Sequence, residues 1–177
     1  MKKTKYYFKK FKTIDVIAGD QENLRRVVET LRFIEKKEPK FFKQIQKLRA
    51  IIVRRAGTYN NSFFPKELVY VCEPATIREA SQAYLSSLLV HEGVHIKQYT
   101  SKRTYIGDVA EEEAYKTQKK FLKKYGTDYE VEWLDEIFKK KWWVKKDKKG
   151  KIRREFLGDK NNRLAKICED YTRGKLK

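Results

Sequence analysis

The spacing of apolar residues predicts a series of amphipathic helices. From Gln21 to Lys37, apolar side chains recur every three or four positions, and Asp20 stands where an N-cap belongs. Pro39 then interrupts this spacing. A second helix is expected after it, and further helices nearer the C-terminus, over residues 41–48, 108–125, 129–140 and 161–171.

Short runs of β-branched and aromatic residues predict strands between these helices. The clearest run, Leu68 to Cys72, is bounded by prolines, and a similar run lies within residues 50–56. Residues 57–62 are rich in turn-forming types and predict a loop. Residues 1–19 alternate lysine with aromatic and β-branched side chains, so they form either an extended arm or a first strand. The mixture predicts an α+β fold.

One predicted helix is apolar on nearly every side. It ends near Tyr99 and begins either at Thr76, which forms a capping-box pattern with Glu79, or at Ser81. A helix without a polar face belongs in the centre of a fold. The sequence H-E-G-V-H lies within this helix at 91–95, so its histidines are expected to be largely buried.

His91, Glu92 and His95 form the pattern H-E-x-x-H, and the chain has no other histidine. Side chains four residues apart lie on one face of a helix, so both imidazoles can bind one metal ion. Glu92 lies beside them, where it can act as general base toward a water on that ion. Two plainer interpretations stay open, which are a pair of satisfied core histidines and a metal site without catalysis.

A catalytic zinc site needs a third protein ligand, which must be a carboxylate here because no third histidine exists. Glu111, Glu112 and Glu113 lie in the first turns of the helix predicted from residue 108. Glu111 shares a face with the apolar residues that must pack inward, whereas Glu113 lies on a lysine-bearing outer face. We therefore expect Glu111 to be the ligand, with Glu112 as the next choice. The alternative is that Glu111 belongs to a capping box with Asp108.

The sequence H-E-G-V-H followed by E-E-E-A-Y resembles the gluzincins, the H-E-x-x-H metallopeptidases whose third ligand is a glutamate on a second helix. The likeness covers about residues 68–122 and is closest in size to the single-domain minigluzincins. The resemblance implies a small zincin-like domain, in which a mixed sheet packs on the long helix that carries the active site. It also implies Zn²⁺-dependent hydrolysis of a peptide bond, with Glu92 activating the water and three metal ligands: His91, His95 and Glu111.

The same resemblance implies where a substrate binds and what stabilises the reaction. In H-E-x-x-H peptidases the strand before the active-site helix often forms the sheet edge along which an extended substrate lies. That role falls to residues 68–72 or to the segment leading into them, unless 68–72 form a plain core strand. A metal ligand at Asp108 would instead resemble the aspzincins. Thermolysin-like members use a further histidine as oxyanion donor, and the candidates that could replace it are Tyr105 and Tyr115, with Tyr99 and Arg103 as alternatives.

Length and composition bound the organisation of the chain. Its 177 residues, 40% of them hydrophobic, predict one folded domain over 1–177, with a core of about 50–126 and a helical, basic part over 127–177. The chain has no apolar run long enough to span a membrane and no secretory signal, so we expect a cytoplasmic protein without a membrane partner. Cys72 and Cys168 are expected to be reduced thiols, although a disulfide between them stays open.

The chain is strongly basic, with 43 lysines and arginines against 24 acidic residues and a net charge of +19. This charge fits either a solvated lysine-rich surface or nonspecific contact with nucleic acid. Basic runs occur at 139–141 and 145–151, the second around Gly150 as a candidate hairpin turn. The expected partner is a peptide or protein substrate. The alternatives are a nucleic-acid-associated protease resembling the basic SprT-type proteins, and a non-catalytic binding protein stabilised by zinc.

Overall fold

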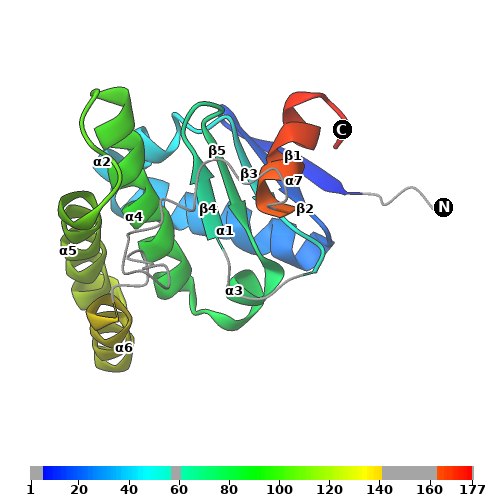
Figure 1. Cartoon of the computed structure of the whole chain (residues 1–177). Helices are drawn as coiled ribbons and strands as arrows, with labels where there is room; N and C mark the ends of the chain where they lie inside the picture. The colour runs from blue at the N-terminus through cyan, green and yellow to red at the C-terminus, as the bar shows by residue number, and fades with distance from the viewer. Residues whose placement is uncertain (1–5, 57–60, 141–162, 177) are drawn as a thin grey trace.

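A five-stranded mixed sheet forms the centre of the computed structural model, which describes residues 6–56, 61–140 and 163–176 (Figure 1). The strand order is β1-β2-β3-β5-β4. Strands β2, β3 and β5 run parallel to one another, and β1 and β4 pair antiparallel at the two edges. The strands span Tyr7–Phe11 (β1), Ile14–Ala18 (β2), Ala50–Val53 (β3), Asn61–Phe64 (β4) and Val69–Cys72 (β5).

Helices cover both faces of this sheet. On one face, α1 (Gln21–Lys37), α2 (Pro39–Ile45) and α4 (Gln82–Thr100) share a large hydrophobic core with the strands. On the other face lies α7 (Arg163–Thr172), whose Cys168 and Tyr171 complete a smaller core. The remaining helices are α3 (Pro74–Glu79), α5 (Asp108–Tyr125), which packs on α4, and α6 (Asp128–Lys139), which packs on α5.

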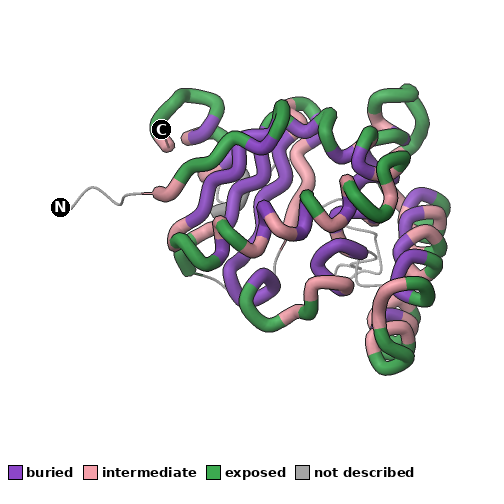
Figure 2. Tube along the Cα trace, turned by 180° about the vertical axis from the view of Figure 1, so that it is seen from behind, coloured by how far each residue is buried: buried purple, intermediate pink, exposed green. Residues whose placement is uncertain are grey.

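The apolar runs of the three parallel strands follow from this two-sided cover, and the one acidic side chain among them, Asp15 of β2, accepts a hydrogen bond from the Tyr171 hydroxyl of α7 at 2.9 Å. Alternate side chains of a strand point to opposite faces, so a strand between two layers of helices is apolar on both faces. Ile51 and Val53 of β3 face the larger core, whereas Ile52 faces the smaller one. Figure 2 shows the central strands buried along their length, whereas α5 and α6, which pack outside α4, have exposed outer faces.

Most predicted elements around the site are confirmed. α1 has the predicted bounds, and the Asp20 side chain accepts a hydrogen bond from the backbone N–H of Asn23 as its N-cap. α4 is largely buried, and it begins at the second of the two predicted starts, with Ser81 as N-cap. The predicted capping box at Thr76 is wrong, because α3 already begins at Pro74 and Thr76 lies inside that short helix.

The edges of the sheet differ from the sequence prediction. Residues 7–18 form two paired strands rather than an arm or a single strand, and Ile14–Ala18 is fully buried. Asn61 and Ser62, predicted to lie in a loop, begin β4. Since β4 pairs with β5, the strand at 69–72 is a core strand, and its edge role is wrong. The edge nearest to it in the sheet is β4.

Cys72 and Cys168 are both buried free thiols, so the disulfide between them does not form. They belong to the cores on opposite faces of the sheet. Within the described ranges, no helix is both long enough and apolar enough to cross a membrane. The candidate hairpin turn around Gly150 lies outside the described residues.

Candidate metal centre

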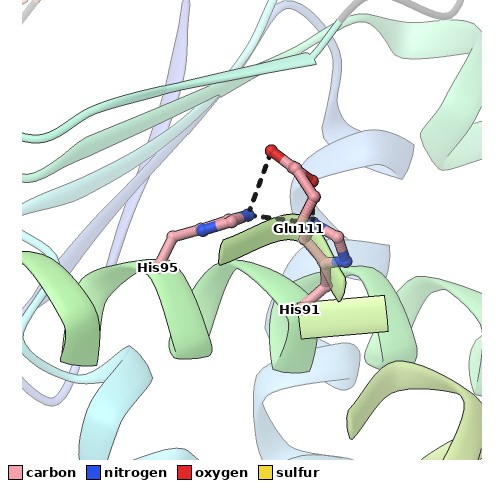
Figure 3. A group of neighbouring side chains, drawn as sticks. All are labelled: His91, His95 and Glu111. Atoms are coloured by element: carbon pink, nitrogen blue, oxygen red, sulfur yellow. Dashed lines mark hydrogen bonds and ion pairs between the residues drawn. The ribbon is translucent and has the colours of Figure 1, made fainter. Parts of the chain in front are cut away.

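Helices α4 and α5 bring His91, His95 and Glu111 together, although α5 reaches the site only after the loop that follows α4 (Figure 3). The Nε2 atoms of the two imidazoles lie 3.1 Å apart. The carboxylate oxygens of Glu111 lie 3.4 Å from Nε2 of His91 and 3.6 Å from Nε2 of His95. The side chains of His91, His95 and Glu111 are 15, 7 and 13% exposed, respectively, so water is largely excluded from the site.

These distances approach those between the ligand atoms of a tetrahedral metal site. With metal–ligand bonds of about 2.0–2.1 Å, ligand atoms at tetrahedral corners lie about 3.3 Å from one another. The two Nε2 atoms lie 3.1 Å apart, and the 3.4 and 3.6 Å distances run to different oxygens of Glu111, Oε2 for His91 and Oε1 for His95. With one ligand atom from each residue, the three atoms lie within 4.8 Å of one another, so an adjustment of the Glu111 side chain alone would bring them around one ion. Among the described residues, His91, His95 and Glu111 form the one group of His, Cys, Asp or Glu side chains that could hold a metal.

A buried amide fixes the orientation of His95. Nδ1 of His95 lies 2.9 Å from Oε1 of Gln98, which is fully buried. The amide nitrogen of Gln98 donates to a Glu113 carboxylate oxygen at 3.0 Å and to the Ala110 carbonyl at 3.3 Å. Because both of these partners are acceptors, the amide oxygen must be the atom that faces His95. Nδ1 therefore carries the proton, and Nε2 presents its lone pair to the centre.

A second amide does the same for His91. Nδ1 of His91 lies 3.0 Å from Oε1 of Gln118 on α5. The amide nitrogen of Gln118 donates to Ser87 Oγ at 3.2 Å, and that hydroxyl donates in turn to the Tyr84 carbonyl at 2.7 Å. The hydroxyl proton is thus directed away from Gln118, which leaves the amide oxygen for His91. Both imidazoles carry the proton on Nδ1 and direct Nε2 toward Glu111.

With both Nδ1 atoms protonated, the two Nε2 atoms and the Glu111 carboxylate direct lone pairs toward one another, and a cation between them, either a proton on an Nε2 atom or a metal ion, stabilises this arrangement. Burial raises the pKa of the Glu111 carboxyl, but hydrogen bonds with His91 and His95 outweigh burial and lower this pKa to about 2. Burial lowers the pKa of His95, yet the Glu111 and Glu92 carboxylates raise it to about 9. The anionic surroundings thus favour positive charge at the imidazoles. A divalent metal ion satisfies the same demand with better geometry.

Glu92 lies next to the three converging side chains without being one of them. Burial raises the pKa of the Glu92 carboxyl, the charge of Glu111 raises it further, and the two imidazoles lower it. Glu92 directly follows His91 in α4, and its carboxyl interacts electrostatically with all three residues. A carboxyl group with a raised pKa is suited to accept and return a proton.

The other acidic candidates lie outside the centre. Glu112 pairs with Lys116 on the exposed face of α5, at 2.7 Å. Glu113 pairs with Arg103 at 2.6 Å and accepts the Gln98 amide, so it supports the site from outside. Asp108, the first residue of α5, is exposed and does not belong to the converging group.

The candidate oxyanion donors contact other parts of the protein. The Tyr115 hydroxyl donates to Asp135 on α6, and its ring stacks on Phe138, so Tyr115 faces α6. Tyr105 packs its ring edge-to-face against Tyr99. Within the described residues, the hydrogen bonds of these tyrosines do not reach the imidazoles or Glu111. The oxyanion donor stays a prediction.

Sequence reasoning did not find Gln98 and Gln118, which orient the imidazoles. A signal existed for Gln118, because it is a polar residue within the inward, otherwise apolar stripe of α5. Gln98 follows His95 by three positions, the spacing at which side chains meet on a helix. In neither case does the sequence show that the amide faces a histidine, since that depends on how α4 and α5 pack.

Comparison with known families places the chain in a defined group. Residues 14–146 match the family described as "Domain of unknown function (DUF6647)". The chain belongs to the DUF6647 family. The matched region runs from β2 to beyond α6 and includes the two histidines, Glu92 and Glu111 of the candidate centre. No curated protein and no solved structure matches the chain.

Proposed function

We propose that this DUF6647 protein is a zinc-dependent peptidase of the gluzincin type. The observation that carries the proposal is the convergence of His91, His95 and Glu111 beside the Glu92 carboxyl. A long buried helix that carries the two histidines, and a second helix that supplies the glutamate, match what the motif resemblance implies. The mixed sheet with an antiparallel edge strand is compatible with a zincin-like fold.

The chemistry of the ligands favours zinc over other common ions. Mg²⁺ and Ca²⁺ prefer sites built from oxygen atoms, whereas two imidazoles and one carboxylate form the protein ligand set of many catalytic zinc sites. Such a site keeps a fourth position for water or substrate. Gln98 and Gln118 support this assignment, because a histidine that binds a metal commonly donates its other N–H to an oxygen atom.

Each residue then has a role in hydrolysis. Zinc, when bound, would polarise a water molecule and the scissile carbonyl. Glu92 would take the proton of the attacking water and deliver it to the leaving amine, because its raised pKa suits both transfers. Glu111 would hold the two helices at the metal and neutralise part of its charge. Gln98 and Gln118 would keep both imidazoles in the tautomer that presents Nε2.

The sheet edge offers a place for an extended substrate. In the described part of the chain, β4 pairs on one side with β5 and has no partner strand on its other side. Its four residues, Asn61–Phe64, are all half-buried. A peptide could add to this edge through main-chain hydrogen bonds, which need no particular side chain sequence. Of the two predicted positions, the proposal therefore keeps the segment leading into 68–72, which contains β4.

Glu92→Gln tests the proposal, because it removes the base while leaving the metal ligands in place. We expect the wild-type protein to bind one zinc ion per chain and to cleave fluorescently quenched casein. Glu92→Gln should bind zinc with unchanged affinity and lose activity by about 10²- to 10⁴-fold. Glu112→Gln is the matched control, since Glu112 pairs with Lys116 at the surface, and it should retain full activity.

The two parts of the proposal can fail separately. A wild-type protein that binds no zinc, measured by equilibrium dialysis and metal analysis, would overturn the metal site itself. Zinc binding without hydrolysis, together with identical behaviour of wild type and Glu92→Gln, would identify a non-catalytic zinc protein. Cleavage that persists at full rate in Glu92→Gln would exclude Glu92 as the base.

A further inference from the structure

Exposed lysines line α2, which packs on the side of α4 that faces away from the histidines, and the C-terminal half of α5, which meets the start of α2. Gly93 marks that side, because a Cβ at this position would lie 3.3 Å from Cγ1 of Ile45 on α2. Two residues along a helix correspond to a rotation of about 200°, so Gly93 and its neighbour α2 lie nearly opposite His91. α2 and α5 both pack on α4 (Figure 1).

The first row of lysines follows α2. Lys40, Lys43 and Lys47 are exposed and spaced by three and four residues, so they form one stripe along this short helix and its end. The Lys47 ammonium donates to Thr100 Oγ1 at 3.3 Å, which ties this end of the stripe to the C-terminus of α4. Lys97, one turn earlier on α4, is also exposed.

The second row of lysines lies on the C-terminal half of α5. Lys120 and Lys124 are four residues apart and exposed. Lys124 bonds to Glu38 at 2.8 Å, and Glu38 immediately precedes α2. A hydrogen bond from Lys124 lowers the pKa of Glu38, with a smaller contribution from the charge of Lys120. Both α5 lysines therefore lie beside the beginning of the α2 stripe.

Carboxylates do not balance the charge of this surface. Glu38 and Glu113 lie beside it, and each is already paired with a basic side chain. Lys40, Lys43 and Lys120 take part in none of the ion pairs found for the described residues, whereas many other lysines and arginines of the chain are paired. We call this surface the α2–α5 lysine face: Lys40, Lys43, Lys47, Lys97, Lys120 and Lys124.

We propose that the α2–α5 lysine face binds the phosphate backbone of nucleic acid, independently of base sequence. Lysine presents a compact charge on a flexible stem, which contacts phosphate groups without reading base edges. Two rows of lysine charges, joined where Lys124 pairs with Glu38 just before α2, complement a polymer that carries one phosphate at every nucleotide. None of these lysines belongs to the converging group of His91, His95 and Glu111, so the face would hold nucleic acid without using the candidate metal ligands.

The composition of the face favours nucleic acid over a membrane surface. Helices that bind anionic membranes combine basic residues with large apolar side chains that enter the lipid. The large exposed apolar residues of the described chain lie elsewhere, on β1, around the start of α5 and on α6. None of them is on α2 or on the C-terminal half of α5, and they are Phe8, Ile106, Val109, Tyr129 and Trp133.

Two triple variants with the same loss of charge test the proposal. Lys40→Gln, Lys43→Gln and Lys120→Gln remove three charges from the face. The control combines Lys9→Gln and Lys10→Gln on β1 with Lys66→Gln in the turn before β5, three exposed lysines away from it. Binding of the full-length proteins to a random-sequence 20-base-pair DNA duplex is measured by fluorescence anisotropy at several salt concentrations. Thermal unfolding verifies that each variant is folded.

The salt dependence gives the deciding result. The logarithm of the binding constant should fall linearly with the logarithm of salt for the wild type, and the face variant should lower that slope by about 2 to 3, because each lost phosphate contact removes about 0.9. The control should change the slope by less than about 1. Equal losses in both triple variants would overturn the proposal, because net charge alone would then explain binding. So would absence of DNA binding at low salt, or tighter binding to phosphatidylserine vesicles than to DNA.

Discussion

At the scale of single residues, two buried amides decide which nitrogen each histidine presents at the candidate centre. Free imidazole exchanges its proton between Nδ1 and Nε2, and metal binding requires one chosen nitrogen to be unprotonated. Oε1 of Gln98 and of Gln118 accepts the Nδ1 proton of one histidine each. Both amides are anchored through their nitrogen atoms, so neither can rotate without losing hydrogen bonds.

This arrangement predicts the effect of removing either amide. Gln98→Leu and Gln118→Leu should each weaken zinc binding by about 10- to 100-fold, the usual cost of losing such a support. Gln82→Leu is the control on the same helix, because Gln82 bonds to Thr30 rather than to a histidine, and it should leave affinity unchanged. Competition with a fluorescent zinc chelator measures the dissociation constants. Equal affinities for Gln98→Leu and Gln82→Leu would show that the amide does not support the site.

The sequence was sufficient to predict that Glu111 lies beside the two histidines, but not what surrounds it. Glu111 lies on the same face of α5 as the buried residues Ala114 and Gln118, and this periodicity is visible in the amino-acid sequence alone. The role of the amides was not visible, because each hydrogen bond to a histidine depends on the direction of a side chain within a tertiary contact. Periodicity predicts which face is buried, and it does not predict which buried atoms meet.

At the scale of elements, the close contact between α2 and α4 depends on Gly93. A glycine in a helix interior costs about 1 kcal/mol relative to alanine, so its presence calls for a reason. A Cβ at Gly93 would lie 3.3 Å from Cγ1 of Ile45, a fully buried side chain, which is closer than ordinary packing allows. The absence of a side chain lets α2 approach the middle of α4, directly behind the motif that carries the histidines.

Gly93→Val should therefore destabilise the protein by overpacking. We expect the free energy of unfolding, measured with urea, to fall by about 1–3 kcal/mol. Ile45→Ala alone should cost about 2–5 kcal/mol through the cavity it leaves. In the double variant the valine can fill part of that cavity, so the double loss should be smaller than the sum of the single losses by at least about 1 kcal/mol. Strictly additive losses would show that the two positions are not in contact.

Element boundaries were predicted well where local signals are strong and poorly where pairing decides. Asp20 caps α1 as predicted, since an N-cap is a local interaction. Residues 61–64 form β4 although Asn61 and Ser62 favour turns, because hydrogen bonding to β5 overrides their local preference. The strand at 69–72 could not be assigned to the core or the edge from sequence, because strand order is set by contacts between distant segments.

At the scale of the whole molecule, the sheet with α1 and the outer helix α5 contribute differently to the candidate centre. The sheet and α1 form a core that positions α4 from behind, whereas α5 packs mainly on α4 and contacts α1 through Phe121 and Tyr125 near its C-terminal end. The loop after α4, the hydrogen bonds of Gln98 and the three side chains at the centre join the two helices at this end. A metal ion there would connect α4 and α5 directly, so its binding free energy would add to the stability of the fold.

Zinc should therefore raise the melting temperature. A ligand that binds only the folded state at 100 times its dissociation constant stabilises by about 2.7 kcal/mol, which corresponds to about 5–11 °C for a chain of this size. Excess EDTA should reverse the shift, and Mg²⁺ should not produce it, since the imidazoles disfavour a hard ion. Glu111→Ala should lose most of the shift, whereas Glu112→Ala, which removes a surface partner of Lys116 from the same turn, should keep it. Differential scanning fluorimetry provides the measurement. A shift that survives in Glu111→Ala and disappears in Glu112→Ala would assign the third ligand to Glu112. The geometry of the centre argues against that outcome, because the carboxylate oxygens that lie 3.4 and 3.6 Å from the two imidazoles belong to Glu111.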